Sequence, residues 1–93
     1  MAVYKFTKDA SIKLKEIYEY SLIHFGEDRA DEYFISLHKA FELLAEQPGL
    51  GRKFHEFHRH EHNDYVFFYK ITECGILVVH IYHQKENIGE KFQ

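Results

Sequence analysis

The sequence predicts an α+β fold in which an N-terminal helical hairpin packs on one face of a small antiparallel sheet. Two apolar segments, residues 65–71 and 76–82, are rich in Val, Ile, Tyr and Phe, and a short break containing Gly75 separates them. This pattern is typical of two strands joined by a tight turn. Two longer segments before them space apolar residues three and four apart, as amphipathic helices do. We therefore expect the order β-α-α-β-β-β in one domain, residues 1–93.

The first third of the chain is predicted to form a strand and a helix. Residues 3–6 alternate, so that Tyr4 and Phe6 share one face of a strand. Thr7 is placed as the N-cap of the helix, because its hydroxyl can accept a hydrogen bond from a backbone N–H of the first turn. The helix should end at Gly26. Its apolar face comprises Ala10, Leu14, Ile17, Tyr18, Ser21 and Phe25.

A second helix is predicted to start at Glu27 or Asp28 and to end before Pro48. A link of only two or three residues makes the two helices antiparallel neighbours. Residues 47–51 should form a rigid exit turn, since they contain one proline and two glycines. The apolar face of this helix comprises Ala30, Tyr33, Phe34, Leu37, Phe41 and Leu44.

The two apolar segments should lie at the centre of the sheet, because they are apolar at nearly every position rather than at alternate ones. Strands of that kind are covered on both faces. Residues 56–59 can pair beside them as an edge strand, and residues 84–93 form a polar tail. We expect the helices to cover one face of the sheet, and the other face to be covered by something outside the chain.

The register of the two central strands stays open between two alternatives. A plain two-residue turn sets Phe67 opposite His80, whereas a glycine bulge at Gly75 shifts the register by one and sets Phe68 there. The choice decides which aromatic row faces the helices and which side His80 takes.

Composition excludes several classes of protein. The 93 residues carry 12 Lys and Arg against 15 Asp and Glu, a net charge of −3, whereas general nucleic-acid binders have a strong basic excess. A single cysteine permits no internal disulfide. Neither a signal peptide nor an apolar run of membrane-spanning length is visible. We expect a cytoplasmic protein with no membrane contact and no direct sequence-specific nucleic-acid binding.

Histidines are concentrated in the second half of the chain. His58, His60 and His62 alternate and should share one face of a strand, which His80 and His83 could approach. Alternation separates neighbouring histidines by about 7 Å, whereas zinc ligands converge within about 2 Å of one point. We therefore predict neither a metal site nor a cofactor.

Acid–base catalysis on the sheet is a second possibility. Arg52, Arg59, Lys70, His83 and Lys85 lie on or beside the predicted sheet. A base there could remove a ribose hydroxyl proton from RNA while cations stabilise the negative charge that develops on phosphorus. The spacing of these residues does not by itself distinguish such a site from solvated strand ends.

An ordered set of motifs covers nearly the whole chain and resembles the ParE branch of the ParE/RelE toxin superfamily. The set comprises Phe25-Gly26, Leu44-Ala45, Pro48, Gly51-Arg52, Tyr65-Val66-Phe67-Phe68-Tyr69-Lys70 and a second apolar strand that ends in Tyr82-His83.

The resemblance implies the toxin of a type II toxin–antitoxin module, a system of growth arrest and plasmid stabilisation in which toxin and antitoxin form a hetero-oligomer. ParE-like members inhibit DNA gyrase, whereas RelE-like members cleave mRNA on the ribosome. His80, Lys85 and Asn87 depart from residues often found in the superfamily, and Phe92 stands in a tail that lacks the tyrosine expected of an RNA-cleaving relative. These features favour a gyrase inhibitor that is not an enzyme.

Three readings remain, each with its own residues. If the chain is instead a metal-independent endoribonuclease, its catalytic residues are Arg59, His83 and Lys85. A degenerate toxin kept for antitoxin binding is the third reading, suggested by His80 and Asn87. The candidates for target binding are Arg52, Arg59, Lys70, His80, His83 and Lys85. The candidates for antitoxin binding are Tyr18, Leu22, Phe34, Val78 and Tyr82.

Overall fold

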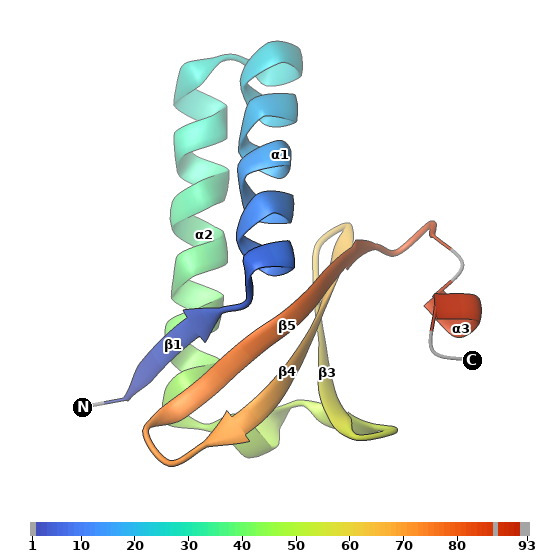
Figure 1. The fold of residues 1–93 in the computed structure, drawn as a ribbon. Helices are drawn as coiled ribbons and strands as arrows, with labels where there is room; N and C mark the ends of the chain where they lie inside the picture. Colours follow the sequence, from blue (N-terminus) through green and yellow to red (C-terminus); the bar gives the residue numbers. More distant parts are fainter. Residues whose placement is uncertain (1, 87, 92–93) are drawn as a thin grey trace.

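Figure 1 shows the computed structural model, which describes residues 2–86 and 88–91 as a helical hairpin standing on one face of a five-stranded sheet. The predicted fold class is confirmed, and a three-residue strand is added before the predicted edge strand. The elements are β1 (Val3–Phe6), α1 (Lys8–Phe25), α2 (Glu27–Glu46), the 3₁₀ turn η1 (Pro48–Leu50), β2 (Arg52–Phe54), β3 (Phe57–His62), β4 (Tyr65–Thr72), β5 (Gly75–His83) and α3 (Ile88–Lys91).

β4 and β5 lie at the centre of the sheet, as their doubly apolar sequences predict. The strand order is β1-β5-β4-β3-β2, and β2, β3, β4 and β5 are antiparallel neighbours. β1 instead pairs parallel to β5, with Val3 opposite Gly75 and Phe6 opposite Val78. The sheet is therefore mixed. β1 and β2 lie at its two edges, and the helical hairpin connects them along the chain (Figure 1).

The predicted helix boundaries are confirmed. Thr7 is the N-cap of α1, and its Oγ1 accepts a hydrogen bond from the Ala10 N–H at 3.3 Å. Gly26 alone links the two helices, with a φ of +88° that suits glycine, so the link is shorter than predicted. α2 ends before Pro48, which opens the 3₁₀ turn. None of the helices in the described part of the chain is long and apolar enough to span a membrane.

The main core lies between the helical hairpin and the sheet. Most of the predicted helix faces are buried in it, but Phe25 is 58% exposed. This residue ends α1 at the tip of the hairpin, which rises above the sheet (Figure 1). The buried residues of this core are Ala10, Leu14, Ile17, Leu37, Phe41, Leu44, Ala45, Phe67, Tyr69, Ile76, Val78 and Ile81.

The register of β4 and β5 combines the two predicted alternatives. The turn has only two residues, as the first alternative requires. An extra residue, Val79, then enters β5, so that Phe68 rather than Phe67 lies opposite His80. The bulge is therefore at Val79 and not at Gly75. As a result Phe67 faces the helices, while Phe68 and His80 lie on the other face.

Thr7 fixes the bulge as well as the start of α1. Its N–H donates to the Val78 carbonyl and its hydroxyl donates to the Val79 carbonyl, both at 3.0 Å. One side chain therefore caps a helix and satisfies the carbonyl that the bulge turns away from β4.

The second face of the sheet is covered in part by the chain itself, which corrects our expectation of an outside cover. Phe57, Val66 and Phe68 form a buried cluster there. Ile88 of α3 packs against this cluster, so the C-terminal segment returns to the sheet. Half-buried Phe54, Val79 and Tyr82 complete the surroundings.

The Tyr69 hydroxyl joins the sheet to the turn that follows α2. It donates to the Pro48 carbonyl at 2.6 Å and accepts from the Gly51 N–H at 3.0 Å. Burial raises the pKa of Tyr69, opposed in part by the Gly51 hydrogen bond, so the hydroxyl remains protonated at neutral pH. Gly51 must be glycine here, because a Cβ atom would collide with this hydroxyl.

Tyr69→Phe is expected to lower the free energy of unfolding by about 1–3 kcal/mol, because it leaves the Pro48 carbonyl and the Gly51 N–H without their partner. Urea titration followed by circular dichroism measures the change. The matched control is Tyr20→Phe, whose ring is 54% exposed and whose replacement should change stability by less than about 0.5 kcal/mol. Equal effects of the two substitutions would contradict the role assigned to the Tyr69 hydroxyl.

Candidate functional site

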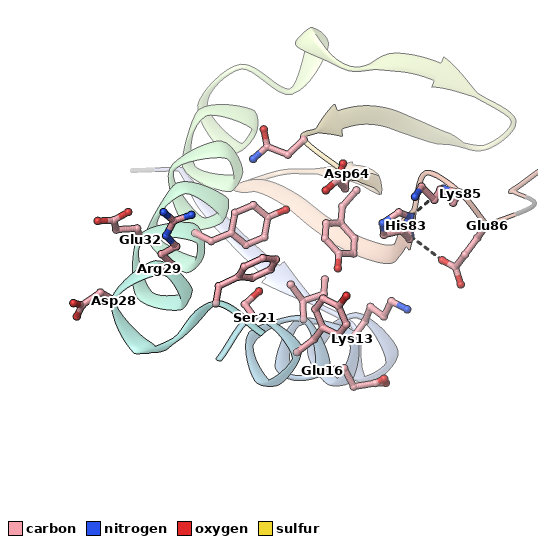
Figure 2. Close-up of a pocket in the computed structure, with 16 residues that line it drawn as sticks. Lys13, Glu16, Ser21, Asp28, Arg29, Glu32, Asp64, His83, Lys85 and Glu86 are labelled. Atoms are coloured by element: carbon pink, nitrogen blue, oxygen red, sulfur yellow. Dashed lines mark hydrogen bonds between the residues drawn. The ribbon is translucent and has the colours of Figure 1, made fainter. Parts of the chain in front are cut away.

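A large open cleft lies between the helical hairpin and the ends of β4 and β5 (Figure 2). Its volume of about 1570 Å³ exceeds the roughly 300–1,000 Å³ of small-molecule pockets, so the cleft suits a polypeptide segment better. It is lined by Lys13, Glu16, Ile17, Tyr20, Ser21, Phe25, Asp28, Arg29, Glu32, Tyr33, Asn63, Asp64, Tyr65, His83, Lys85 and Glu86.

At the sheet end of this cleft the chain folds back on itself after β5. The Glu86 carboxylate accepts a hydrogen bond from the His83 N–H at 2.7 Å, and His83 Nδ1 accepts one from the Lys85 N–H at 3.1 Å (Figure 2). The Nδ1 lone pair is therefore occupied, which places the proton of the neutral ring on Nε2. In this state the imidazole can donate a hydrogen bond through its Nε2–H, and it has no free nitrogen lone pair that could act as a base.

The opposite face of the sheet carries four of the six candidates for target binding, namely Arg52, Arg59, Lys70 and His80. Arg52, Arg59, Phe68 and His80 lie in one row across β2, β3, β4 and β5. Glu61 accepts hydrogen bonds from Arg52 at 2.9 Å and from Arg59 at 3.3 Å. The Arg59 guanidinium also lies 6.0 Å from the Phe68 ring centre, within range of a cation–π contact.

Lys70 lies on the same face, next to that row. Its Nζ is 3.8 Å from the Glu56 carboxylate and 5.4 Å from the Phe57 ring centre. Arg52, Arg59 and Lys70 thus each have a carboxylate beside them, which lowers the positive potential that a phosphate group would meet there.

The structure does not bring the three proposed nuclease residues together. Arg59 lies on the face away from the helices, whereas His83 and Lys85 line the cleft on the helix side. Along the strands, Arg59 is level with His80, and the backbone of His83 is about 10 Å further on and two strands away. A single scissile phosphate cannot contact all three side chains.

The alternating histidines of β3 share one face, as predicted. They lie on the helix side, opposite Tyr69, Phe67 and Tyr65. His62 Nε2 is 2.8 Å from the hydroxyl of Ser36 in α2. Within the described ranges, no three His, Cys, Asp or Glu side chains are grouped so that they could bind a metal ion.

The antitoxin candidates are only partly brought together. Tyr18 and Phe34 meet on the part of the helical hairpin that does not line the cleft, which we call its outer surface. Their ring centres are 5.4 Å apart, and the Tyr18 hydroxyl donates to Asp31 at 2.7 Å. Leu22, 40% exposed, lies one helical turn from Tyr18. Val78 is wrong as a contact residue, because its side chain is fully buried under the helices.

Tyr82 lies apart from that surface, on the other face of the sheet beside Val66 and Phe68. Burial raises the pKa of its hydroxyl, and the carboxylates of Glu86 and Asp9 raise it further. Asn87 and Phe92, which entered the prediction of a gyrase inhibitor, lie outside the described residues.

Of the residues that line the cleft, only His83 and Lys85 were selected as site candidates from the sequence, and Tyr33 and Glu86 are two that were missed. Tyr33 was assigned to a helix core face, yet it lines the cleft, where burial and the neighbouring Tyr65 hydroxyl raise its pKa to about 12. Glu86 was not selected at all. The signal that could have identified it is its position three residues after the end of a predicted strand, where a carboxylate can reach the last backbone N–H of that strand.

Comparison with known proteins identifies relatives over nearly the full length of the chain. The family described as "ParE toxin of type II toxin-antitoxin system, parDE" matches residues 4–88. "Toxin ParE1" of Caulobacter vibrioides is 26% identical over 91 residues, covering 94% of each chain. "Toxin ParE1" of Mycobacterium tuberculosis is 27% identical over 90 residues, covering 91% of this chain and 92% of the relative.

A solved structure has the same fold. It is titled "Chromosomal ParDE TA system from P. aeruginosa" and superposes with a TM-score of 0.72 at 18% identity. The likeness covers 89% of this chain and 96% of that chain.

Acidification from pH 7.5 to 5.5 is expected to lower the free energy of unfolding. Burial lowers the pKa values of His38, His60 and His62, with a further lowering of His62 by His60. Below their ordinary pKa of about 6.5, these imidazoles bind protons more readily in the unfolded chain, which is thereby favoured. Urea titrations at several pH values measure the slope of the free energy of unfolding against pH, and His38→Gln should reduce this slope. A stability that is constant or rises over this range would contradict the assignment.

Proposed function

Since this chain belongs to the ParE toxin family of type II toxin–antitoxin systems, we propose that it inhibits DNA gyrase in the cytoplasm and is neutralised by a cognate antitoxin. The proposal makes the protein an inhibitor that acts by binding and not an enzyme.

The observation that carries the proposal is the separation of the catalytic candidates. Arg59 lies on one face of the sheet while His83 and Lys85 lie at the cleft on the other. General acid–base catalysis requires its groups within hydrogen-bond reach of the same reacting atoms. A binding surface has no such requirement, so the same residues are compatible with an inhibitor.

The charge distribution supports a protein target over a nucleic-acid target. The net charge is −3, and on the face away from the helices Arg52, Arg59 and Lys70 lie beside Glu61 or Glu56. Pairs of this kind favour specific contacts with a folded partner, because each can be exchanged for a complementary pair across an interface.

The outer surface of the helical hairpin is our proposed antitoxin contact. Tyr18, Leu22 and Phe34 lie there with part of their apolar surface open to solvent. Large half-exposed aromatic residues are the usual centres of protein interfaces. This surface and the face carrying Arg59 are on different sides of the molecule, so antitoxin and target do not need to compete for the same residues.

Purified protein is expected to inhibit supercoiling by DNA gyrase, and its expression alone should arrest growth. A supercoiling assay on relaxed plasmid measures the first effect. Arg52→Ala together with Lys70→Ala should weaken inhibition by about tenfold or more, corresponding to ~1.4 kcal/mol of binding free energy. Lys39→Ala on an exposed position of α2 is the matched control and should leave inhibition unchanged.

Three other outcomes would replace this proposal or move its target surface. Cleavage of ribosome-bound transcripts with supercoiling untouched would establish the endoribonuclease. Harmless expression together with tight antitoxin binding would establish a degenerate toxin. Loss of inhibition in Lys85→Ala, with Arg52→Ala and Lys70→Ala unaffected, would move the target contact to the cleft.

Phe34→Ala is expected to weaken antitoxin binding by about tenfold or more, because it removes an aromatic side chain from the proposed contact. Isothermal titration with the antitoxin measures the change. Tyr20→Ala is the matched control, since Tyr20 is an exposed aromatic residue on the cleft side of the hairpin. If Tyr20→Ala weakens binding and Phe34→Ala does not, the antitoxin contacts the cleft instead of the outer surface.

A further inference from the structure

The tip of the helical hairpin projects from the body of the molecule. α1 and α2 rise above the sheet and are joined by Gly26 alone, and the residues from 22 to 29 are all exposed (Figure 1). The turn is held by two hydrogen bonds. The Gly26 N–H donates to the Leu22 carbonyl at 3.1 Å, and the Ala30 N–H donates to the Gly26 carbonyl at 3.0 Å. A partner that binds here meets a preformed surface and does not have to order it.

This tip displays large apolar side chains to solvent. Among the large hydrophobic residues of the described ranges, Ile23 and Phe25 have the highest exposed fractions, 81% and 58%. Tyr20 is exposed as well, one helical turn from Ile23. The ring centre of His24 lies 4.1 Å from that of Tyr20 and 6.4 Å from that of Phe25, so these side chains form one continuous surface. We call Tyr20, Ile23 and Phe25 the apolar tip. Single exposed apolar residues are normal on a protein, whereas a group of them marks a contact site.

The acidic charge of the chain is concentrated around the apolar tip. Residues 19–32 carry one arginine and five carboxylates, and their charge of −4 exceeds the net −3 of the whole chain. All five carboxylate residues are exposed, and none makes an ion pair with another described residue. They are Glu19, Glu27, Asp28, Asp31 and Glu32.

The fold accounts for only part of this charge. Glu27 and Asp28 lie in the first turn of α2, where carboxylates offset the helix dipole. Asp31 accepts the hydrogen bond from Tyr18. Neither reason applies to Glu19 or Glu32, and like charges gathered at one end of a molecule repel one another. These carboxylates are therefore available to cations of a partner.

The charge decides what kind of partner fits the apolar tip. Nucleic acids and anionic membrane surfaces are negatively charged, so the tip repels them. A second copy of the chain would bring the same five carboxylates to the contact. A protein pocket with an apolar floor and Lys and Arg at its rim matches both features, because it buries the apolar side chains and pairs the carboxylates.

We propose that the apolar tip docks into an apolar pocket with a basic rim on the target protein, as a second contact in addition to the face that carries Arg59. The inference rests on the proposed function, since the target is the DNA gyrase named there. Ile23 enters the pocket, and the carboxylates around it pair with the cations of the rim. The outer surface with Tyr18 and Phe34 takes no part and stays open to the antitoxin.

The test of the apolar side chains uses the full chain and purified DNA gyrase. Ile23→Ser together with Phe25→Ser should weaken inhibition of supercoiling by about tenfold or more, because a few central side chains carry most of the binding energy of an interface. The matched control is Ile35→Ser together with Ile71→Ser, two exposed positions away from the tip, which should leave inhibition unchanged. Circular dichroism shows whether each variant is folded. If the double tip variant does not fold, Ile23→Ser alone replaces it.

A second pair of variants tests the carboxylates. The chain is labelled with a fluorophore at Cys74, its single cysteine, which is exposed, and anisotropy reports binding to gyrase. Glu19→Lys with Glu27→Gln should weaken binding by about tenfold at low salt, and the difference from the parent should shrink as salt screens the contact. Glu46→Lys with Glu42→Gln makes the same change of charge at exposed positions near the other end of α2 and is the control.

Isothermal titration with the antitoxin separates the apolar tip from the outer surface of the hairpin. Ile23→Ser together with Phe25→Ser should leave the affinity for the antitoxin unchanged, in contrast to the loss expected for Phe34→Ala.

The results that would overturn the inference differ from those that would overturn the proposed function. Inhibition by the parent chain that the tip variants retain, tip variants that lose antitoxin binding while they still inhibit, or a dimer of the parent that Ile23→Ser dissociates would each overturn the inference alone. Absence of any inhibition by the parent chain would overturn the proposed function, and the inference with it.

Discussion

The contact of Thr7 with the bulge in β5 determines most of what this molecule presents to its surroundings. Thr7 ends the pairing of β1 with β5, caps α1 and satisfies the two carbonyls beside the bulge. The bulge shifts the register by one residue, so that Phe68 and not Phe67 faces away from the helices. One threonine side chain, with its backbone N–H, thereby contributes to the register of the core row, the start of the first helix and the end of the pairing between β1 and β5.

Residues with strong local preferences made much of the fold predictable from the sequence. Thr7, Gly26 and Pro48 bound the helices where the capping rules place them, and the two doubly apolar strands lie at the centre of the sheet. The parallel pairing of β1 was not predictable, since no local signal in residues 3–6 distinguishes a parallel from an antiparallel neighbour. The bulge was foreseen as a possibility, but its position depends on Thr7, which lies 72 positions away from Val79 in the chain.

The candidate site was less predictable, because side-chain direction in a strand depends on register. Arg59 and His83 look like members of one cationic group in the sequence, yet the structure places them on opposite faces of the sheet. Val78 was expected on the surface and is fully buried, since residues before the bulge keep the helix-facing phase. Tyr18 and Phe34, on helices whose phase is fixed by 3.6-residue periodicity, do lie together as neighbours.

The pairing of the first strand with the last has a consequence for how the chain matures during synthesis. Val3 lies opposite Gly75 and Phe6 opposite Val78, so the edge strand has no neighbour until residues 75–78 have left the ribosome. The helical hairpin, in contrast, consists of local contacts and can form early, as N-terminal segments do in translation. The sheet, and with it every surface that depends on β5, can be completed only after residues 75–83 have been synthesised. A chain truncated before Gly75 lacks the strand with which its first strand pairs.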